Sequence, residues 1–439
     1  MIQALQLLLS LSILVVLHEF GHYITAKMFG CRVEKFYLFM DWPIALFKKK
    51  IGETEFGIGC APLGGYVKIS GMVDESMDTD GLESAPQPWE LRAKPAWQRL
   101  IVMLGGIFVN IILAWFIFSM MTFAWGDKRV PMESLKDGFT FSSNVQQLGF
   151  EDGDRLISID TLNLAEYNGV SLITSLLFKS PKEVVVDRDG KRVVIQIKED
   201  VLNDVIGGLS REVPPLDPRK EWLVSGFSET SFAQSSGMEI GDRIVSINDV
   251  KTPYYSIKAK EEMLLHKNDS VRVVVERAGE TKFLDIKLDG DGLLGTLSSP
   301  GYTVEIIDYS FLNSFGVGLT KTVETMDLYW AQMKAIFNPK TGGYKHVGGF
   351  ISIGQMFPDR WHWPTFWFMT AFLSIILAIM NLLPIPALDG GHAVIALGEM
   401  ITGKRLPLKI LMPLQIVGMV ILFALIIYAN GNDIVNLFK

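Results

Sequence analysis

The sequence predicts a polytopic α-helical membrane protein with four transmembrane helices, a membrane-associated β-hairpin and two inserted α+β domains. Three observations carry this prediction: four long uncharged runs, a glycine-rich stretch of β-forming residues, and an internal repeat between the second and third runs. Hydrophobic residues make up 49% of the 439-residue chain. The chain contains no basic block, so we expect the lipid bilayer rather than nucleic acid as a partner.

Each of the four uncharged runs is long enough to cross a bilayer, which takes about 20 residues. The runs cover residues 1–17 with a continuation to 26, and then 100–125, 363–388 and 410–429. The first run is also compatible with a signal peptide, but no Lys or Arg precedes its apolar stretch and no small-residue cleavage site follows it. We therefore expect the first run to be a retained helix.

The positions of Lys and Arg predict how the four helices are oriented. Basic residues flank one end of each run: Lys27, Arg32, Lys35, Arg92, Lys94, Arg99, Lys404, Arg405 and Lys409. By the positive-inside rule, the loops 27–99 and 389–409 are cytoplasmic. Both chain ends and the segment 127–362 then lie on the opposite side of the membrane.

The stretch EFGIGCAPLGGYVKISG (55–71) is rich in glycine and β-forming residues and has no helical period. We expect it to form a β-hairpin near the membrane. Its open edge would receive an extended peptide by adding a strand, although a purely structural hairpin is an equally good interpretation.

The middle of the chain repeats itself at a period of about 90 residues. GFEDGDRLISIDTLNL (149–164) aligns with GMEIGDRIVSINDVKT (237–252), and VVVDRDG (184–190) aligns with VVVERAG (273–279). The pattern of strands and glycine turns predicts two copies of one small domain. The shared G-D-R core resembles that of a PDZ domain, a fold that binds extended chains along a sheet edge.

These features divide the chain into five expected parts. They are 1–126 with the first two helices and the β-loop region, 127–215 and 216–300 as two PDZ-like domains, 301–362 as a connector with an amphipathic helix over 311–337, and 363–439 with the last two helices.

The first run contains the motif H-E-F-G-H, which places three ionisable residues inside a predicted span. His18 and His22 are four residues apart, so they share one helix face and both imidazoles can reach one metal ion. Glu19 lies beside that face and can take a proton from a metal-bound water. Ionisable groups in a span are costly and therefore indicate function.

A catalytic zinc needs a third protein ligand. The third run ends in MNLLPIPALDGGH (380–392), where Pro384 and Pro386 break the helix at membrane depth. Such irregular backbone is tolerated where it lines a site or cavity. We expect Asp389, on the same side of the membrane as the two histidines, to be the third ligand. His392 is the alternative.

The H-E-F-G-H motif in the first span, paired with N-x-x-P-x-P-x-L-D-G in a later one, resembles the site-2 family of intramembrane zinc metalloproteases. The four spans and the tandem PDZ-like insertion resemble the bacterial regulator-of-sigma-E type of that family. In the second run, G-G-I-F-V-N (105–110) matches the small residues and polar Asn of the family, although Gly105–Gly106 stands where a Gly-Pro pair is common.

The resemblance implies a complete set of site residues. These are His18, His22 and Asp389 for Zn²⁺, and Glu19 as the base. Asn381, with the loop of Pro384 and Pro386, would help to position the substrate. Gly57, Ile58 and Gly59 would belong to a membrane-associated β-loop that holds the substrate in extended form. It also implies a multi-pass protein of the bacterial inner membrane with periplasmic PDZ-like domains and an active site near the cytoplasmic side.

The substrates implied by the resemblance are single-pass membrane proteins. They are an anti-sigma factor already truncated by a first protease, within extracytoplasmic stress signalling, and remnant signal peptides. Two other classes compete with this interpretation: a membrane-anchored PDZ scaffold with a structural metal site, and a metal transporter. A structural zinc site normally has four protein ligands, and a conducting path would need more intramembrane carboxylates or histidines.

Overall fold

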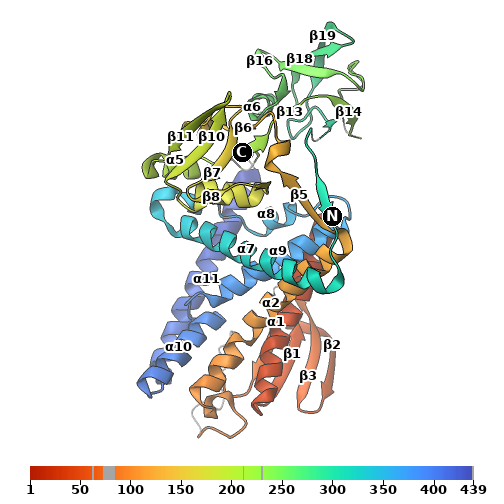
Figure 1. Ribbon diagram of the computed structural model, residues 1–439. Coiled ribbons are helices and arrows are strands. Elements are labelled where there is room, and N and C mark those ends of the chain that lie inside the picture. The colour runs from red at the N-terminus through yellow and green to blue at the C-terminus, as the bar shows by residue number, and fades with distance from the viewer. Residues whose placement is uncertain (62–63, 73–84, 211, 229–230, 300, 438–439) are drawn as a thin grey trace. The chain divides into compact units, whose positions relative to one another are not determined.

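The computed structural model describes residues 1–61, 64–72, 85–210, 212–228, 231–299 and 301–437 (Figure 1). The chain divides into two compact units. The helical unit contains Met1–Gly126, Asp308–Trp330 and Val347–Lys439, and the β-rich unit contains Asp127–Ile307 and Ala331–His346. The finer five-part division expected from the sequence stays a prediction.

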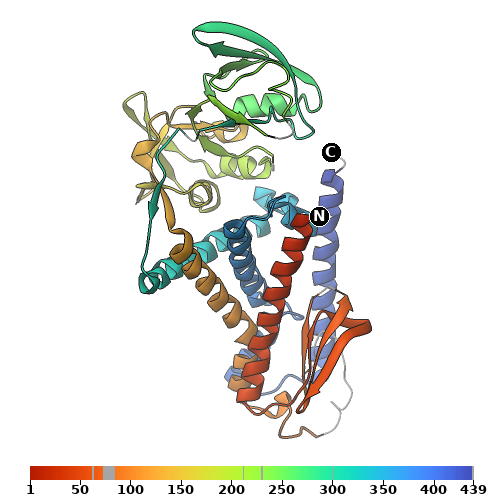
Figure 2. The same ribbon diagram turned by 90° about the vertical axis from the view of Figure 1, so that its right-hand side faces the viewer.

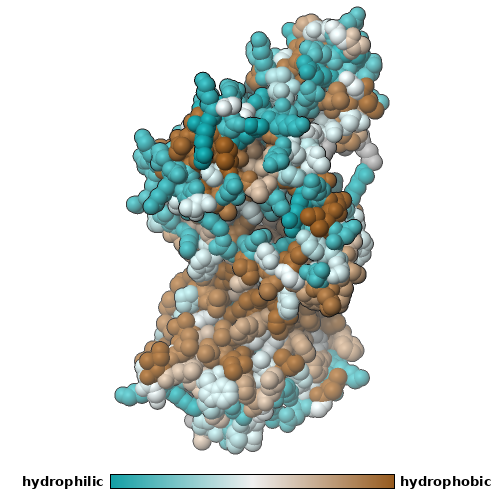
Figure 3. Space-filling view, in the orientation of Figure 1, coloured by the Kyte–Doolittle hydropathy of each residue, from teal (hydrophilic) through white to brown (hydrophobic). Residues whose placement is uncertain are grey.

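Among the described residues, four helices are long and apolar enough to cross a membrane, as predicted. They are α1 (Ile2–Met28), α2 (Ala96–Trp125), α9 (Trp363–Leu382) and α11 (Leu408–Leu437). Figure 3 shows a broad hydrophobic surface over this helical part. On α11, the side chains of Val417, Val420, Phe423 and Ile427 are 54–71% exposed, which suits a lipid environment and not water.

The third span is shorter than expected, because α9 ends at Leu382 and not at residue 388. Pro384 and Pro386 lack the N–H groups that would continue the helix. A further helix, α10 (Asp389–Thr402), then begins where the sequence predicted a loop. Its opening Asp-Gly-Gly reads as a turn in the sequence, which hid this helix.

The helices α1, α2 and α9 lie side by side, as both views show (Figures 1 and 2). Two glycines make the α1–α2 contact possible, since a Cβ atom on Gly105 would lie only 2.6 Å from the carbonyl oxygen of Gly21. Small residues of this kind let helix backbones approach closely in a membrane protein. This close crossing sets the position of the histidine-bearing turn of α1.

The amphipathic helix expected over 311–337 is present as α7 (Phe311–Phe337). Its first part belongs to the helical unit, where the Trp115 indole N–H of α2 donates a hydrogen bond of 2.9 Å to the Phe315 carbonyl. A short helix, α8 (Phe350–Gln355), packs against α1 and α11 within the same unit.

The predicted hairpin over 55–71 is part of a larger, four-stranded sheet. The strand order is β2-β3-β1-β4, with β1 (Val33–Leu38), β2 (Met40–Ile51), β3 (Thr54–Ala61) and β4 (Tyr66–Ile69). The first two strands were not predicted, because charges in β1 and a proline and three lysines in β2 interrupt the alternation typical of strands. In this order β3 is an interior strand, and β4 is an edge strand next to β1.

The β-rich unit contains two sheets with matching strand order, which confirms the internal repeat. One sheet is β11-β10-β7-β8 and the other is β19-β18-β15-β16. A β-bulge falls at Ile157 in the first copy and at its counterpart Val245 in the second. Both hairpins also turn on two residues with positive φ, Asp189–Gly190 and Ala278–Gly279, as a type I′ turn requires. The PDZ-like identity of the two copies stays a prediction.

The strands of these two sheets have matching positions in the repeat. They are β7 (Arg155–Ile159), β8 (Leu162–Asn163), β10 (Glu183–Arg188) and β11 (Lys191–Gln196), and then β15 (Arg243–Ile247), β16 (Val250–Lys251), β18 (Ser270–Arg277) and β19 (Glu280–Lys287).

Shorter elements complete the β-rich unit. The strands are β5 (Asp127–Pro131), β6 (Phe139–Phe141), β9 (Glu166–Tyr167), β12 (Leu216–Pro218), β13 (Lys220–Glu221), β14 (Val224–Phe227), β17 (Tyr254–Tyr255), β20 (Thr296–Ser298) and β21 (Glu305–Ile307), and the helices are α3 (Ser143–Gln146), α4 (Gly169–Ile173), α5 (Glu199–Gly207) and α6 (Ile257–Leu264).

A buried aspartate and an arginine form the same fork in both copies. In the first, Arg188 Nε and Nη2 donate to the two carboxylate oxygens of Asp154 at 2.7 and 2.8 Å. In the second, Arg277 donates in the same way to Asp242 at 2.6 and 2.7 Å. Burial alone would raise the pKa of the Asp242 carboxyl, but the hydrogen bonds from Arg277 and the Glu239 backbone lower it. The G-D-R motif is therefore tied to the end of a later strand.

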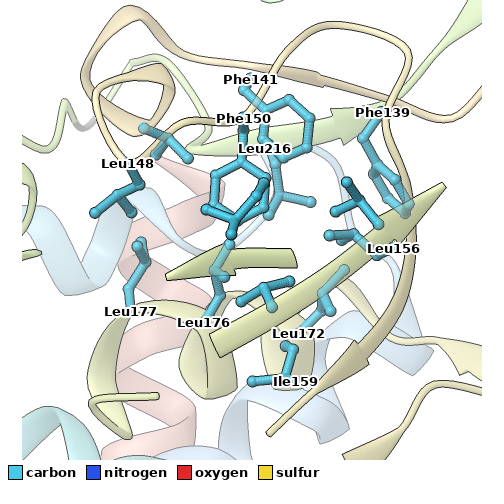
Figure 4. Close-up of a cluster of buried hydrophobic side chains, with 14 of the residues drawn as sticks. Phe139, Phe141, Leu148, Phe150, Leu156, Ile159, Leu172, Leu176, Leu177 and Leu216 are labelled. Atoms are coloured by element: carbon cyan, nitrogen blue, oxygen red, sulfur yellow. The ribbon is translucent and has the colours of Figure 1, made fainter. Parts of the chain in front are cut away.

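Each copy has its own hydrophobic core. In the first copy, the phenylalanines of β6 and the following segment pack with leucines from the sheet and helices (Figure 4). The rings of Phe141 and Phe150 stack with their centroids 4.9 Å apart. Burying a side chain of this size contributes about 1.5–3 kcal/mol relative to exposure.

Candidate metal centre

Three side chains from two distant parts of the chain meet inside the helical unit. His18 and His22 lie one turn apart on α1, and Asp389 is the first residue of α10. Both histidines are buried, with 7% and 6% of their surfaces exposed. The Nε2 atoms of the two histidines are 3.3 Å apart, and Asp389 Oδ2 lies 3.2 Å from the first and 3.3 Å from the second.

These three atoms form a nearly equilateral triangle that fits one face of a tetrahedral zinc site. Zinc–nitrogen and zinc–oxygen bonds are about 2.0–2.1 Å long, so ligand atoms at the corners of a tetrahedron lie about 3.3–3.4 Å apart. Within the described residues, His18, His22 and Asp389 form the group suited to hold a metal ion. Two imidazoles and one carboxylate are also the ligand types that zinc prefers in catalytic sites.

The helix α2 supports the histidine pair from behind. His22 Nδ1 donates a hydrogen bond of 2.8 Å to the carbonyl oxygen of Val102, which leaves Nε2 free to face the centre. One turn further along, a Cβ atom on Gly106 would lie 2.5 Å from His22 Nε2 and 2.7 Å from His18 Nδ1. Any larger residue would push into both rings, so glycine is required at this position.

Two asparagines contact the other histidine. Asn110 of α2 lies with its amide nitrogen 3.1 Å from His18 Nδ1, and its side chain is completely buried. Asn381, near the end of α9, lies with its amide nitrogen 3.2 Å from His18 Nε2. The first asparagine therefore contacts the back of the imidazole, and the second lies at the side that faces the centre.

A cavity of about 430 Å³ opens onto the centre. Glu19 lines this cavity beside the three-residue cluster but is not a member of it. A Cβ atom on Gly65, just before β4, would lie 3.6 Å from Glu19 Cγ, so the carboxylate-bearing side chain packs close to this strand. All four residues of β4 line the cavity: Tyr66, Val67, Lys68 and Ile69.

An ion pair lies at the same cavity, outside the membrane-spanning helices. The pKa of Lys35 is raised, first because its ammonium donates a hydrogen bond of 2.9 Å to Asp41 Oδ2. Both groups are therefore charged near neutral pH. They give the cavity a polar wall where it meets the sheet.

The loop between α9 and α10 fixes the approach of Asp389. Ala387 has a φ angle of +134°, which is unfavourable for any residue other than glycine. Gly418 of α11 lies directly against the carbonyl of Pro386. The far end of α10 is joined to α2 by an ion pair between Glu399 and Arg99, whose side chains are 8% and 17% exposed.

The structure brings together half of the site residues predicted from the sequence. His18, His22 and Asp389 form the cluster, and Glu19 and Asn381 line the cavity. His392, the alternative third ligand, lines the cavity without joining the cluster of described residues.

The remaining predicted residues lie outside the cavity lining. Pro384 and Pro386 shape the loop that leads to Asp389. Gly57, Ile58 and Gly59 belong to β3, whose two edges are already paired with β1 and β2. The strand whose residues line the cavity is instead β4.

The roles of the α2 residues beside the histidines were not predictable from the sequence. Val102 contributes only a carbonyl oxygen, which no side-chain pattern reveals. Gly106 and Asn110 were noted as small and polar residues of a predicted span. Because they are four residues apart, they share one face of α2. That this face contacts the histidines of α1 could not be predicted without knowing how the two helices cross.

Comparisons with known proteins agree with this geometry. The family model described as Peptidase family M50 matches residues 6–425. The Regulator of sigma E protease of Haemophilus influenzae is 26% identical over 98% of both chains. Proteins of Clostridium perfringens and Vibrio cholerae whose names place them among the zinc metalloproteases are each 27% identical, over 98% of this chain and 97% and 98% of their own.

Proposed function

The chain belongs to Peptidase family M50, and from this premise we propose that it hydrolyses a peptide bond within the transmembrane segment of a single-pass membrane protein. It is a site-2 type metalloprotease, and its cofactor is zinc. The observation that carries the proposal is the triangle of His18, His22 and Asp389, which forms between α1, a helix long enough to cross a membrane, and the first residue of α10.

The protein's own groups are arranged for hydrolysis of an amide. Zinc, when bound by these three residues, supplies Lewis acidity that lowers the pKa of water and polarises a carbonyl. Glu19 lines the same cavity outside the ligand set, so it accepts the proton of the attacking water and later delivers it to the leaving amine. Asn381, whose amide faces the centre, donates a hydrogen bond that orients the substrate carbonyl.

The edge strand β4 holds the substrate in extended form. A transmembrane helix shields its own peptide carbonyls in hydrogen bonds, so the segment must unwind before hydrolysis. β4 pairs with β1 alone in its sheet, and its residues line the cavity. An unwound segment added to this edge gains backbone hydrogen bonds that replace those of the helix. Gly57, Ile58 and Gly59 support this sheet from its interior.

The cellular role follows from the same premise. The substrates are an anti-sigma factor already cut by a first protease, and remnant signal peptides, in extracytoplasmic stress signalling. The relative from Haemophilus influenzae, named for the regulation of sigma E, supports this role. The enzyme is a multi-pass protein of the bacterial inner membrane, with its active site near the cytoplasmic side. Its periplasmic PDZ-like pair excludes substrates with bulky outer domains.

The test compares the full-length wild type with Glu19→Gln on a single-pass peptide substrate in detergent. General-base catalysis contributes about 10²–10⁴-fold, so Glu19→Gln should keep its zinc and lose cleavage by that factor. A chelator should abolish cleavage by the wild type. Glu324→Gln, an exposed glutamate in α7, is the matched control and should cleave normally.

Two results would count against the proposal. Normal cleavage by Glu19→Gln would remove Glu19 from the mechanism. Cleavage that survives complete removal of zinc would exclude a metalloprotease.

A further inference from the structure

Three residues on one face of α2 lie behind the two histidines. Val102, Gly106 and Asn110 are spaced four residues apart, so they form one stripe along the helix. The first receives a hydrogen bond from His22, the second leaves room for both rings, and the third contacts His18. The stripe therefore packs against both imidazoles.

A histidine that binds zinc through Nε2 must carry its proton on Nδ1. For His22 this condition is met, because Nδ1 faces the carbonyl oxygen of Val102, which can only accept a hydrogen bond. For His18 the group facing Nδ1 is the amide of Asn110, at 3.1 Å. An amide can present either its oxygen or its nitrogen, so its orientation decides the tautomer of His18.

The hydrogen-bond inventory of Asn110 shows which orientation suits a zinc-bound centre. With Nδ2 toward His18, the imidazole proton must sit on Nε2, the atom needed by the metal. Turning the amide lets Oδ1 accept the Nδ1 proton and leaves Nε2 with a free lone pair.

We infer that Asn110 is a positioning residue of the metal centre, whose Oδ1 accepts a hydrogen bond from His18 Nδ1 and so sets the tautomer and ring orientation of that ligand. This inference rests on the zinc site of the proposed function. Asn110 acts through His18 and does not touch substrate.

The surroundings of Asn110 hold it in place for this role. Its side chain is fully buried in a helix that is otherwise strongly apolar. Its backbone carbonyl accepts a hydrogen bond of 2.7 Å from Ser374 of α9. A residue needed only for packing would not require an amide here, since a buried polar group without a partner is unfavourable.

The test measures zinc affinity of the full-length protein in detergent by competition with a chromophoric chelator. Asn110→Leu, which keeps the branched heavy-atom skeleton and removes the polar atoms, should weaken zinc binding about 10–100-fold, as expected when a partner of a metal-bound histidine is lost. Asn110→Asp keeps an acceptor oxygen and should restore affinity to within a few fold of the wild type. Ser119→Ala, another buried polar residue of α2, is the control and should bind normally.

A second readout separates positioning from folding. Cobalt substituted for zinc gives a visible spectrum that reports the ligand geometry, and Asn110→Leu should change it while Ser119→Ala does not. If Asn110→Leu fails to fold, Asn110→Asp alone decides: affinity near that of the wild type supports the inference, and a tenfold loss overturns it.

The outcomes distinguish this inference from the proposed function. A wild type that binds zinc, with Asn110→Leu binding equally well and giving the same cobalt spectrum, overturns the role of Asn110 alone. A wild type that binds no zinc overturns both.

Discussion

Replacing Gly106 with alanine should weaken the metal centre without weakening the helix. In a helix interior, alanine is favoured over glycine by about 1 kcal/mol, so the substitution by itself should stabilise α2. Its new methyl group, however, would lie 2.5 Å from His22 Nε2, 2.6 Å from His18 Cε1 and 2.7 Å from His18 Nδ1. Both ligand rings meet the same atom.

The size of the effect follows from these distances. Non-bonded heavy atoms need about 3.5 Å, so the rings must retreat by about 1 Å. His22 cannot retreat freely, because its Nδ1 donates a hydrogen bond to the carbonyl oxygen of Val102, which lies on α2 like Gly106. A misplacement of about 1 Å costs about 10²-fold in rate. We therefore expect Gly106→Ala to cleave about 100-fold more slowly and to bind zinc more weakly.

The assay has three readouts on the full-length protein in detergent: thermal unfolding, zinc content by mass spectrometry, and cleavage of a single-pass substrate. Gly398→Ala in α10 is the matched control. No described atom beyond its own helix backbone lies within 4 Å of its new methyl group, so it should keep wild-type zinc binding. If Gly106→Ala binds zinc and cleaves as well as Gly398→Ala, the steric argument is refuted.

Asp389→Ala should lower the zinc content because it removes one of the three proposed ligands, and unchanged zinc would point to His392 instead. In the second repeat, Arg277→Ala should speed hydrogen exchange in β15 and β18, because it leaves the buried Asp242 carboxylate without its partner. Arg272 forms an exposed ion pair of 3.6 Å with Asp285, so Arg272→Ala should leave exchange unchanged. Equal exchange rates in Arg277→Ala and Arg272→Ala would contradict the role of the buried pair. Arg277 and the Glu239 N–H lower the pKa of Asp242 in the folded protein. The ionised Asp242 therefore stabilises the fold fully at a pH above its pKa in the unfolded chain, about 3.9, and this contribution is lost as the pH falls through its pKa in the folded protein. Protection of β15 should therefore fall with acid in the wild type and change less in Arg277→Ala; parallel curves would contradict the linkage.

Much of the helical architecture was predictable, because long uncharged runs have few other stable solutions. The crossing of α1 and α2 was not, since it depends on the fit of Gly21 to Gly105 in space. The helix α10 and the strands β1 and β2 were also missed. Their local sequences carry turn residues, a proline and charges, and tertiary packing overrides those weak preferences.

The candidate site was predictable where spacing alone fixes geometry. Two histidines four residues apart share a helix face in any helix, and the proline-broken end of the third run suggested Asp389. The strand proposed to hold the substrate was harder to assign. The family resemblance pointed to Gly57, Ile58 and Gly59, but a side chain at Gly57 would run into the Tyr37 ring and one at Gly59 into the Met40 carbonyl. Strand order decides which edge is free, and the local sequence does not contain it.

The residues of the candidate metal centre come from the two ends of the chain, so they are also synthesised at different times. His18 and Asn381 lie 363 residues apart. At a synthesis rate of about 5–20 residues per second, the N-terminal half of the site waits about 20–70 s before its partner emerges from the ribosome. During that interval the nascent chain carries two histidines and a glutamate but no complete ligand set. We therefore expect a chain that is interrupted before Asp389 to bind no zinc at this site and to cleave no substrate.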